Sequence, residues 1–215
     1  MFSQFARGFL AMGLLGVSQA CASTIIDDAG LSNSQFHVTF DEVVLPQGTV
    51  VTNQFGPFGV TFSTVTLPEY PTSDLRYDVQ GQGATFHGIM GHYIGSTGAN
   101  PVSIEFTEPV SAATFGMASN PRAFTVSALL GGVEIESFSF FSSGGENPQV
   151  NGQLAGFYGF QDITFDEIEI FGILSNPTDN RVLLDNIQFN AVPEPAAGVM
   201  VVAFALVHTA RRRRR

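Results

Sequence analysis

Short runs in which apolar and polar residues alternate recur along the chain, and helical periodicity is nearly absent between its two ends. Alternation with a period of two is typical of a β-strand that buries one face. The runs over residues 102–106 and 124–130 show it clearly. The side chains expected on inner faces are Phe36, Val38, Phe40, Val102, Ile104, Phe106, Phe124, Val126, Ala128 and Leu130.

Two further features indicate how the strands connect and bend. Gly131-Gly132 separates two alternating runs, and a two-glycine spacer of this kind predicts a tight hairpin. The apolar residues change phase between 163–165 and 168–170, so we expect a bulge or bend at residues 166–167.

These strands, the turn signals between them and 21 phenylalanines to fill an interior predict an all-β fold. We expect an antiparallel two-sheet sandwich, jelly-roll-like in type, in one domain over residues 23–191. Residues 67–101 are rich in Gly, Pro and Tyr, with one strand-like run at 84–87, and residues 142–152 form a second loop-like stretch. Long loops often carry binding surfaces, so both stretches are candidates and the longer one is favoured.

The first 22 residues (1–22) have the parts of a secretory signal peptide: a positive start, an apolar stretch and Ala20-Cys21-Ala22 as a small-x-small cleavage site. We expect a signal helix that is cleaved after Ala22. The only cysteine of the chain would leave with it, which excludes disulfides, redox chemistry and thiolate metal sites in the mature protein. A lipoprotein would instead begin at Cys21, but Ser18 stands where a leucine-like residue is usual.

The last residues, 192–215, also fall into three parts. A motif that its prolines hold extended is followed by residues 196–210, which contain no Asp, Glu, Lys or Arg. As a helix this segment would be roughly 22 Å long, short of a hydrocarbon core of roughly 30 Å. The arginines beyond it can snorkel and hold their end on the cytoplasmic side, so we expect a C-terminal transmembrane helix. The motif is Val192, Pro193, Glu194 and Pro195, and the basic cluster is Arg211, Arg212, Arg213, Arg214 and Arg215.

This order of motif, apolar helix and basic cluster resembles the PEP-CTERM sorting signal of Gram-negative bacteria, a tail that also carries the name of the ice-binding protein C-terminal domain. The resemblance covers residues 192–215. It implies that an exosortase, a membrane-embedded enzyme, recognises the tail and cuts near Pro193 to Pro195, with signal peptidase acting at the other end. It also implies transient anchoring in the inner membrane, and then delivery to the cell surface or extracellular matrix of an exopolysaccharide-producing cell.

The net charge of the predicted domain, residues 23–191, limits which classes of partner it can bind. The chain contains no lysine, and three arginines stand against 18 Asp and Glu between residues 27 and 185, a net charge near −15. Binding to a polyanion depends on basic groups that displace its counterions, so nucleic acid and anionic lipid are poor partners. Divalent cations are favoured instead.

Residues 40–63 and 183–189 resemble the first and last strands of β-sandwich domains found ahead of such tails and, more loosely, jelly-roll carbohydrate-binding modules. The resemblance implies that these strands lie together, where an acid often helps to hold a structural Ca²⁺. Asp185 shares its phase with apolar neighbours and is expected to point inward, and a buried carboxylate needs a partner. Asp41 and Glu42 could add oxygen ligands, of which calcium takes six to eight. The alternative places Asp185 at a strand end, bonded to a loop amide or to a nearby arginine.

Other chemistries have less support. His87 and His92 are the only close histidine pair, and nothing near them supplies a third zinc ligand. No serine-elbow or phosphate-loop motif occurs, and no spacing singles out a catalytic pair among the carboxylates. The chain has no tryptophan, but three of its four tyrosines lie in residues 67–101, which leaves a sugar-stacking site open.

The sequence therefore predicts a non-catalytic structural or adhesive β-sandwich that is exported and sorted by its tail. The second hypothesis is a calcium-dependent carbohydrate-binding module for exopolysaccharide. The third is a hydrolase of matrix polymers, which the excess of carboxylates motivates.

Overall fold

The structure is a computed structural model, and it describes most of the predicted body. The described residues are 23–64, 75–79, 89, 91–96, 101–119, 122–142, 149–150, 153–154, 156–173 and 182–192. The expected signal helix with its cleavage site at Ala22 lies outside them, as does the tail from Pro193 to Arg215. Within the described ranges there is no helix long and apolar enough to cross a membrane.

The described residues form β-strands and one short 3-10 helix, η1 (Gly56–Phe58), which confirms the predicted all-β class. The strands are β1 (Ser23–Asp27), β2 (Phe36–Val38), β3 (Val60–Thr64), β4 (Leu75–Val79), β5 (His92–Ser96), β6 (Val102–Ser119), β7 (Arg122–Leu130), β8 (Val133–Ser142), β9 (Gln149–Val150), β10 (Gln153–Leu154), β11 (Phe157–Ile173) and β12 (Val182–Ala191).

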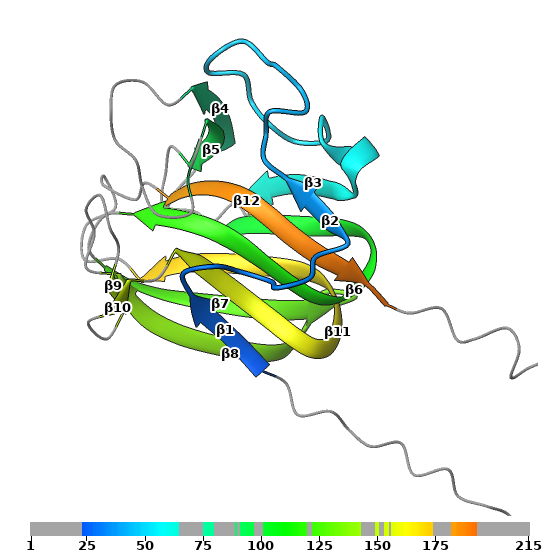
Figure 1. The fold of residues 1–215 in the computed structure, drawn as a ribbon, viewed down its shortest axis with the longest axis vertical. Helices are drawn as coiled ribbons and strands as arrows, with labels where there is room; N and C mark the ends of the chain where they lie inside the picture. The colour runs from blue at the N-terminus through cyan, green and yellow to red at the C-terminus, as the bar shows by residue number, and fades with distance from the viewer. Residues whose placement is uncertain are drawn as a thin grey trace, which may run out of the picture.

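Ten of these strands form one antiparallel sheet, and seven of them follow one another in the order β4-β5-β12-β6-β11-β7-β8. Three short strands extend it, because β1 pairs with β11, β2 with β12 and β3 with β6. The pair β9-β10 is separate. Antiparallel pairing is thus confirmed, but the two layers of the sandwich belong to one continuous sheet that folds over on itself (Figure 1).

The fold-over occurs within β6 and β11, which run through both layers. Residues 102–106 of β6 pair with β3 and with the C-terminal half of β11, whereas residues 110–119 pair with β12 and with the first half of β11. The register of the β6-β11 pair shifts on both sides of Phe165, between Gln161 and Glu167. Such irregularities bend a strand, so the bend predicted near residues 166–167 is confirmed, although the extra residues of β11 itself lie at 162–164.

Aromatic rings fill the space between the layers. Tyr158 of β11 stacks on Phe140 of β8 with ring centroids 4.2 Å apart, and Phe160 meets Phe138 edge-on. Most of the apolar side chains expected inside are buried there. Two of them are not, because Phe36 is 46% exposed and Leu130, beside the turn, is 40% exposed.

The predicted Gly131-Gly132 hairpin is confirmed, with Leu130 paired to Val133 across a two-residue loop. Both glycines have positive φ, 59° and 77°, which is the requirement of a type I′ turn. The view of residues 67–101 as a loop region was wrong in part, because β4 and β5 pair within it. The expected strand-like run at 84–87 lies outside the described residues.

Tyr158 carries a hydroxyl that is costly to bury. The side chain is fully buried, and among the described residues the hydroxyl has no hydrogen-bond partner. Burial raises the pKa of Tyr158 to about 12. Since an unfolded tyrosine titrates near pH 10, the unfolded chain loses this proton first as the pH rises. The free energy of unfolding should therefore fall between about pH 10 and pH 12, by about 1.4 kcal/mol per pH unit.

We expect Tyr158→Phe to keep the ring contacts, to raise the free energy of unfolding by about 1 kcal/mol at pH 7 and to remove this alkaline loss. Tyr77→Phe is the matched control, because the Tyr77 hydroxyl donates a hydrogen bond to the carbonyl of Phe40 at 3.3 Å. That variant should be less stable by about 1 kcal/mol. Urea unfolding at pH 7 and pH 11 measures both, and a destabilised Tyr158→Phe would contradict the assignment.

Candidate functional site

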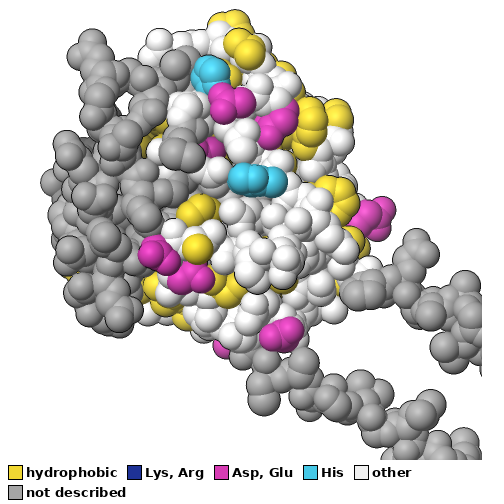
Figure 2. Space-filling model, viewed as in Figure 1, with side chains coloured by type: hydrophobic (Ala, Val, Ile, Leu, Met, Phe, Trp, Pro, Cys, Tyr) yellow, Lys and Arg dark blue, Asp and Glu magenta, His cyan; other side chains and the backbone are white. Residues whose placement is uncertain are grey.

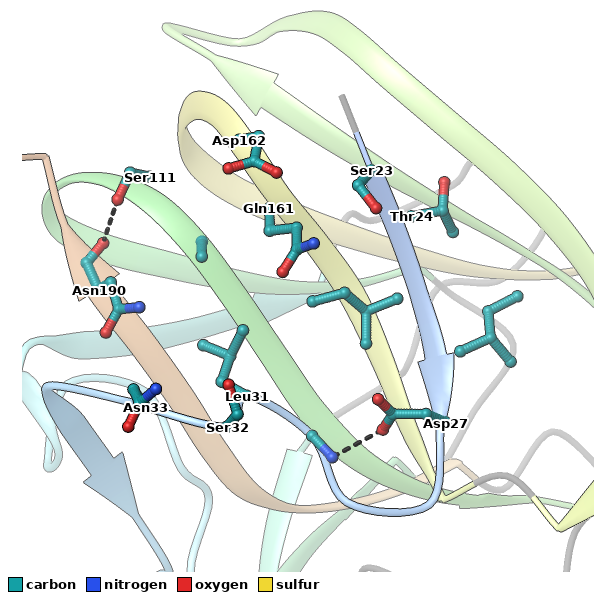
Figure 3. Close-up of a pocket in the computed structure, with 14 residues that line it drawn as sticks. Ser23, Thr24, Asp27, Leu31, Ser32, Asn33, Ser111, Gln161, Asp162 and Asn190 are labelled. Atoms are coloured by element: carbon teal, nitrogen blue, oxygen red, sulfur yellow. Dashed lines mark hydrogen bonds between the residues drawn. The ribbon is translucent and has the colours of Figure 1, made fainter. Parts of the chain in front are cut away.

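A polar groove of about 560 Å³ lies on one face of the sheet, between β1 and the loop that leads from it to β2 (Figure 3). Its volume is in the range of small-molecule sites. Amide, hydroxyl and carboxylate groups dominate its lining. The lining residues are Ser23, Thr24, Ile25, Ile26, Asp27, Gly30, Leu31, Ser32, Asn33, Ser111, Ala112, Gln161, Asp162 and Asn190.

The floor of this polar groove consists of strands that lie far apart in the sequence. Gln161 comes from β11, Ser111 from β6 and Asn190 from β12. Side chains alternate along a strand, so Asn190 faces this groove while its neighbours Phe189 and Ala191 line a different hollow. The Ser111 hydroxyl donates to the carbonyls of Asn190 and Ala191 at 3.4 and 3.2 Å, which joins β6 to the end of β12.

The wall of the groove is a loop that side-chain amides fix to the sheet. The amide N–H of Leu31 donates to Oε1 of Gln188 at 2.7 Å. Gln35 makes a reciprocal pair, because its N–H donates to Oδ1 of Asn190 at 2.7 Å and its own Oε1 accepts from the N–H of Ala191 at 2.9 Å. The rim is therefore held in place before any ligand arrives.

Two acidic residues mark the two ends of the groove (Figure 3). Asp27 turns the chain after β1, since its Oδ1 accepts from the N–H groups of Ala29 and Gly30 at 3.0 and 2.7 Å. Asp162 has a φ of 64°, a left-handed conformation that Asp tolerates better than most residues. This conformation lies within the bulged part of β11, so the bend that joins the layers also places the carboxylate.

The separation of the two acids bears on catalysis. Asp27 pairs with Phe157, and Asp162 lies five residues further along β11, so the backbones at the two residues are roughly 17 Å apart along the strand at about 3.3 Å per residue. Glycosidases need their two carboxyl groups within roughly 5 to 10 Å of each other. This pair does not meet that requirement.

The charge of the groove and of the surrounding surface is negative. The groove lining contains no Lys, Arg or His. On the face in Figure 2, the coloured side chains include Asp, Glu and His but no Lys or Arg. On the other layer, burial and the nearby carboxylates of Glu167 and Glu134 raise the pKa of Glu169. An anionic ligand would be repelled by these groups.

The three residues expected to bind calcium do not come together. Asp41 contacts Nδ1 of His92, and Glu42 accepts from the N–H and hydroxyl of Thr39 at 2.9 and 3.0 Å. Within the described residues, no group of three or more His, Cys, Asp and Glu side chains is placed to hold a metal ion. In this structure Asp41, Glu42 and Asp185 make separate local contacts, and the calcium site expected at them stays a prediction.

Asp185 is fully buried, as the sequence indicated, but on the other side of the strand. The register of β12 shifts between Asp185 and Gln188, and Asn186 has a φ of 50°. Its neighbour Leu184 belongs to the core, so Asp185 points away from it. The carboxylate accepts from the N–H and the side-chain amide of Asn186, its neighbour within β12, at 2.7 and 3.1 Å.

The expectation of sugar-stacking tyrosines is corrected for Tyr77 and Tyr158 and stays a prediction for Tyr93, which is half-buried. Tyr77 and Tyr158 are fully buried, so neither ring can cover a sugar. Tyr70 and His87 lie outside the described residues, and His92 stacks on Tyr77 with ring centroids 5.1 Å apart. None of the groove residues was singled out from the sequence. The one local signal was the polar pair at residues 161–162, which interrupts an apolar run.

No known family profile matches this chain, and no curated protein matches it. Among solved structures, it is similar to the CBM32-2 of a GH31 protein bound to GalNAc, at 14% identity over 62% of this chain and 97% of that one, with a TM-score of 0.31. It is also similar to the K1 cleaved adhesin domain of Lys-gingipain from Porphyromonas gingivalis, at 7% identity, 80% and 99% coverage and a TM-score of 0.37.

A third similar structure is the family 11 carbohydrate-binding module of a cellulosomal cellulase from Clostridium thermocellum, at 13% identity, 70% and 97% coverage and a TM-score of 0.28. All of these TM-scores are below 0.5, so the similarities assign no function to this chain.

We expect Asp185→Ala to lower the free energy of unfolding by about 2 to 4 kcal/mol, because two hydrogen bonds to a buried charged group are lost. Glu42→Ala is the control and should cost under about 1 kcal/mol, since Glu42 is exposed. Urea unfolding measures both changes. A drop in the wild-type melting temperature with EDTA, absent in Asp185→Asn, would instead restore the calcium site.

Proposed function

We propose that this chain is an exported surface or matrix protein whose non-catalytic β-sandwich acts in adhesion, by holding a neutral polysaccharide in the polar groove. The observation that carries the proposal is the lining of that groove. Amides such as Gln161 and Asn190 offer both donors and acceptors, and Asp162 accepts from hydroxyl groups. This is the chemistry that recognises a polyol.

The same lining selects against other ligands. Two carboxylates and no basic side chain disfavour phosphate, uronate and nucleic acid. No aromatic ring lines the groove, so binding would depend on hydrogen bonds rather than on stacking. Such binding is weak at one site, and a long polymer suits it because many copies can attach to one strand.

The position of the last strand is compatible with the sorting part of the proposal. β12 ends at Ala191, just before the proposed sorting motif. Exosortase would then remove the tail without cutting a described strand.

A purely structural role is the second candidate, and hydrolysis is disfavoured by the roughly 17 Å between Asp27 and Asp162. A metal is not part of the proposal, because Asp41, Glu42 and Asp185 make separate contacts.

We expect the protein to be retarded in native gels that contain a neutral polysaccharide such as dextran or galactan, and not in gels that contain alginate. Asp162→Asn and Gln161→Ala should each weaken the retardation by about 3-fold to 10-fold, the effect of one lost hydrogen bond. Asn tolerates the left-handed backbone at residue 162. Glu136→Gln on β8 is the matched control, because it removes one negative charge in the other layer and should change nothing.

Equal retardation of the wild type and both groove variants would place binding elsewhere. No retardation by any neutral polysaccharide would leave the structural role as the better account.

The sorting tail gives a separate prediction. In the native host, mass spectrometry of the mature protein should show Ser23 as the first residue and a C-terminus near Pro193 to Pro195. Replacing Pro193 and Pro195 with alanine should leave the tail attached and the protein in the inner membrane. A chain that stays in the cytosol with Arg215 still present would overturn this part of the proposal, whatever the result with polysaccharide.

A further inference from the structure

A second hollow, of about 400 Å³, lies where the described chain ends, and we call it the apolar groove. Three phenylalanine rings give it an aromatic character. Phe36 and Phe58 are 46% and 36% exposed, and Phe36 stacks on Phe189 with ring centroids 4.9 Å apart. The lining residues are Phe36, His37, Pro57, Phe58, Gly59, Thr107, Glu108, Val110, Phe189 and Ala191.

The backbone is shaped to leave this groove open. Gly59 closes η1 with a φ of 94°, and a Cβ placed there would lie 2.8 Å from the ring of Phe189. The N–H of Thr107 donates to the carbonyl of Gly59 at 3.0 Å, which fixes η1 beside β6. Two partly exposed phenylalanines line this one hollow, and covering their apolar surface would be favourable because such surface is costly to expose to water.

The chain itself leads towards the apolar groove. Ala191 lines it and pairs with Val110, and the N–H of Val192 donates to the carbonyl of Pro109 at 3.3 Å. β12 and β6 are antiparallel, so the next residues after Val192 fall opposite residues 108 and 107 if the same register continues. Both of those residues line the groove.

The chemistry of the next residues fits the groove. Residues 193–195 read Pro-Glu-Pro, and the prolines favour an extended polyproline II conformation. Extended proline segments commonly dock in grooves lined by aromatic rings.

We propose that the sorting motif at residues 193–195 docks in the apolar groove of its own domain. The domain then holds the segment that the processing enzyme has to cut, so cleavage requires the motif to leave the groove. The inference rests on the proposed function only for the role of the motif, since the docking itself follows from the exit of the chain. Anionic lipid and a second copy are less suitable occupants, because the strongly acidic surface repels both more than it repels the single carboxylate of the motif.

Disulfide trapping in the full chain tests the docking without any processing enzyme. In a Cys21→Ser background in detergent, Glu108→Cys is combined with Glu194→Cys, and Phe141→Cys with Glu194→Cys serves as the control pair. Phe141 is 61% exposed at the far end of β8, so its cysteine is accessible but remote. A disulfide needs the two Cα atoms within about 7 Å. We expect the first pair to form an intramolecular disulfide at least 10-fold faster than the control pair.

The groove contribution is isolated by adding Phe36→Ser and Phe58→Ser, which should reduce that rate by at least 5-fold while thermal melting shows that the fold is kept. Phe58→Ser alone is the milder variant if the double change unfolds the domain. A fast rate that persists without the rings would mean that chain continuity alone brings the cysteines together, and it would overturn the proposal. Equal rates for the two cysteine pairs, or disulfides that form only between chains, would overturn it as well.

These outcomes are independent of the proposed sorting role. If the tail is never cut in the native host but the disulfide forms and depends on the rings, the docking stands and the sorting proposal fails. If the tail is cut normally and the cysteines do not react, the reverse holds.

Discussion

The pairing of β6 with β11 is the contact on which the rest of the structure depends. Each strand crosses from one layer to the other, so their common ladder is the only connection that runs through the whole described sheet. The two backbones approach closely at Gly159, where a Cβ would lie 2.0 Å from the carbonyl oxygen of Ala113. The bends of the same two strands place Asp162 in the polar groove and Val110 in the apolar groove. Core and grooves therefore share one support.

The sequence predicted those parts of the fold that depend on local pattern. Alternation located the buried faces of β6 and β7, the two glycines located the hairpin, and a change of phase located the bend of β11. The pattern failed where position in the sheet overrides it. Leu130 follows a register shift and reaches the turn, and Phe36 covers Phe189 from outside the core. β4 and β5 were missed because both runs are short, β4 contains the charged residues Arg76 and Asp78, and β5 contains Gly95.

The candidate site could not be predicted for a different reason. Its wall depends on hydrogen bonds between residues more than 150 positions apart, such as Leu31 with Gln188. Its floor depends on a left-handed residue, Asp162, whose conformation no alternation pattern records. The expected orientation of Asp185 assumed regular alternation through β12, and the shift near Asn186 breaks that assumption. Local sequence patterns predict the strands well, but they do not predict the contacts between strands that are distant in the sequence.

The place of β12 in the sheet has a mechanical consequence for a protein held by its C-terminal end. β12 lies between β5 and β6 and also pairs with β2, so tension applied at Ala191 enters an interior strand. Its hydrogen bonds are perpendicular to the strand, so a pull along the strand loads many of them at once in shear. An edge strand would instead be peeled away one bond at a time. In the proposed anchored state, the sandwich would therefore be held at a point where it can resist the drag of a flowing medium.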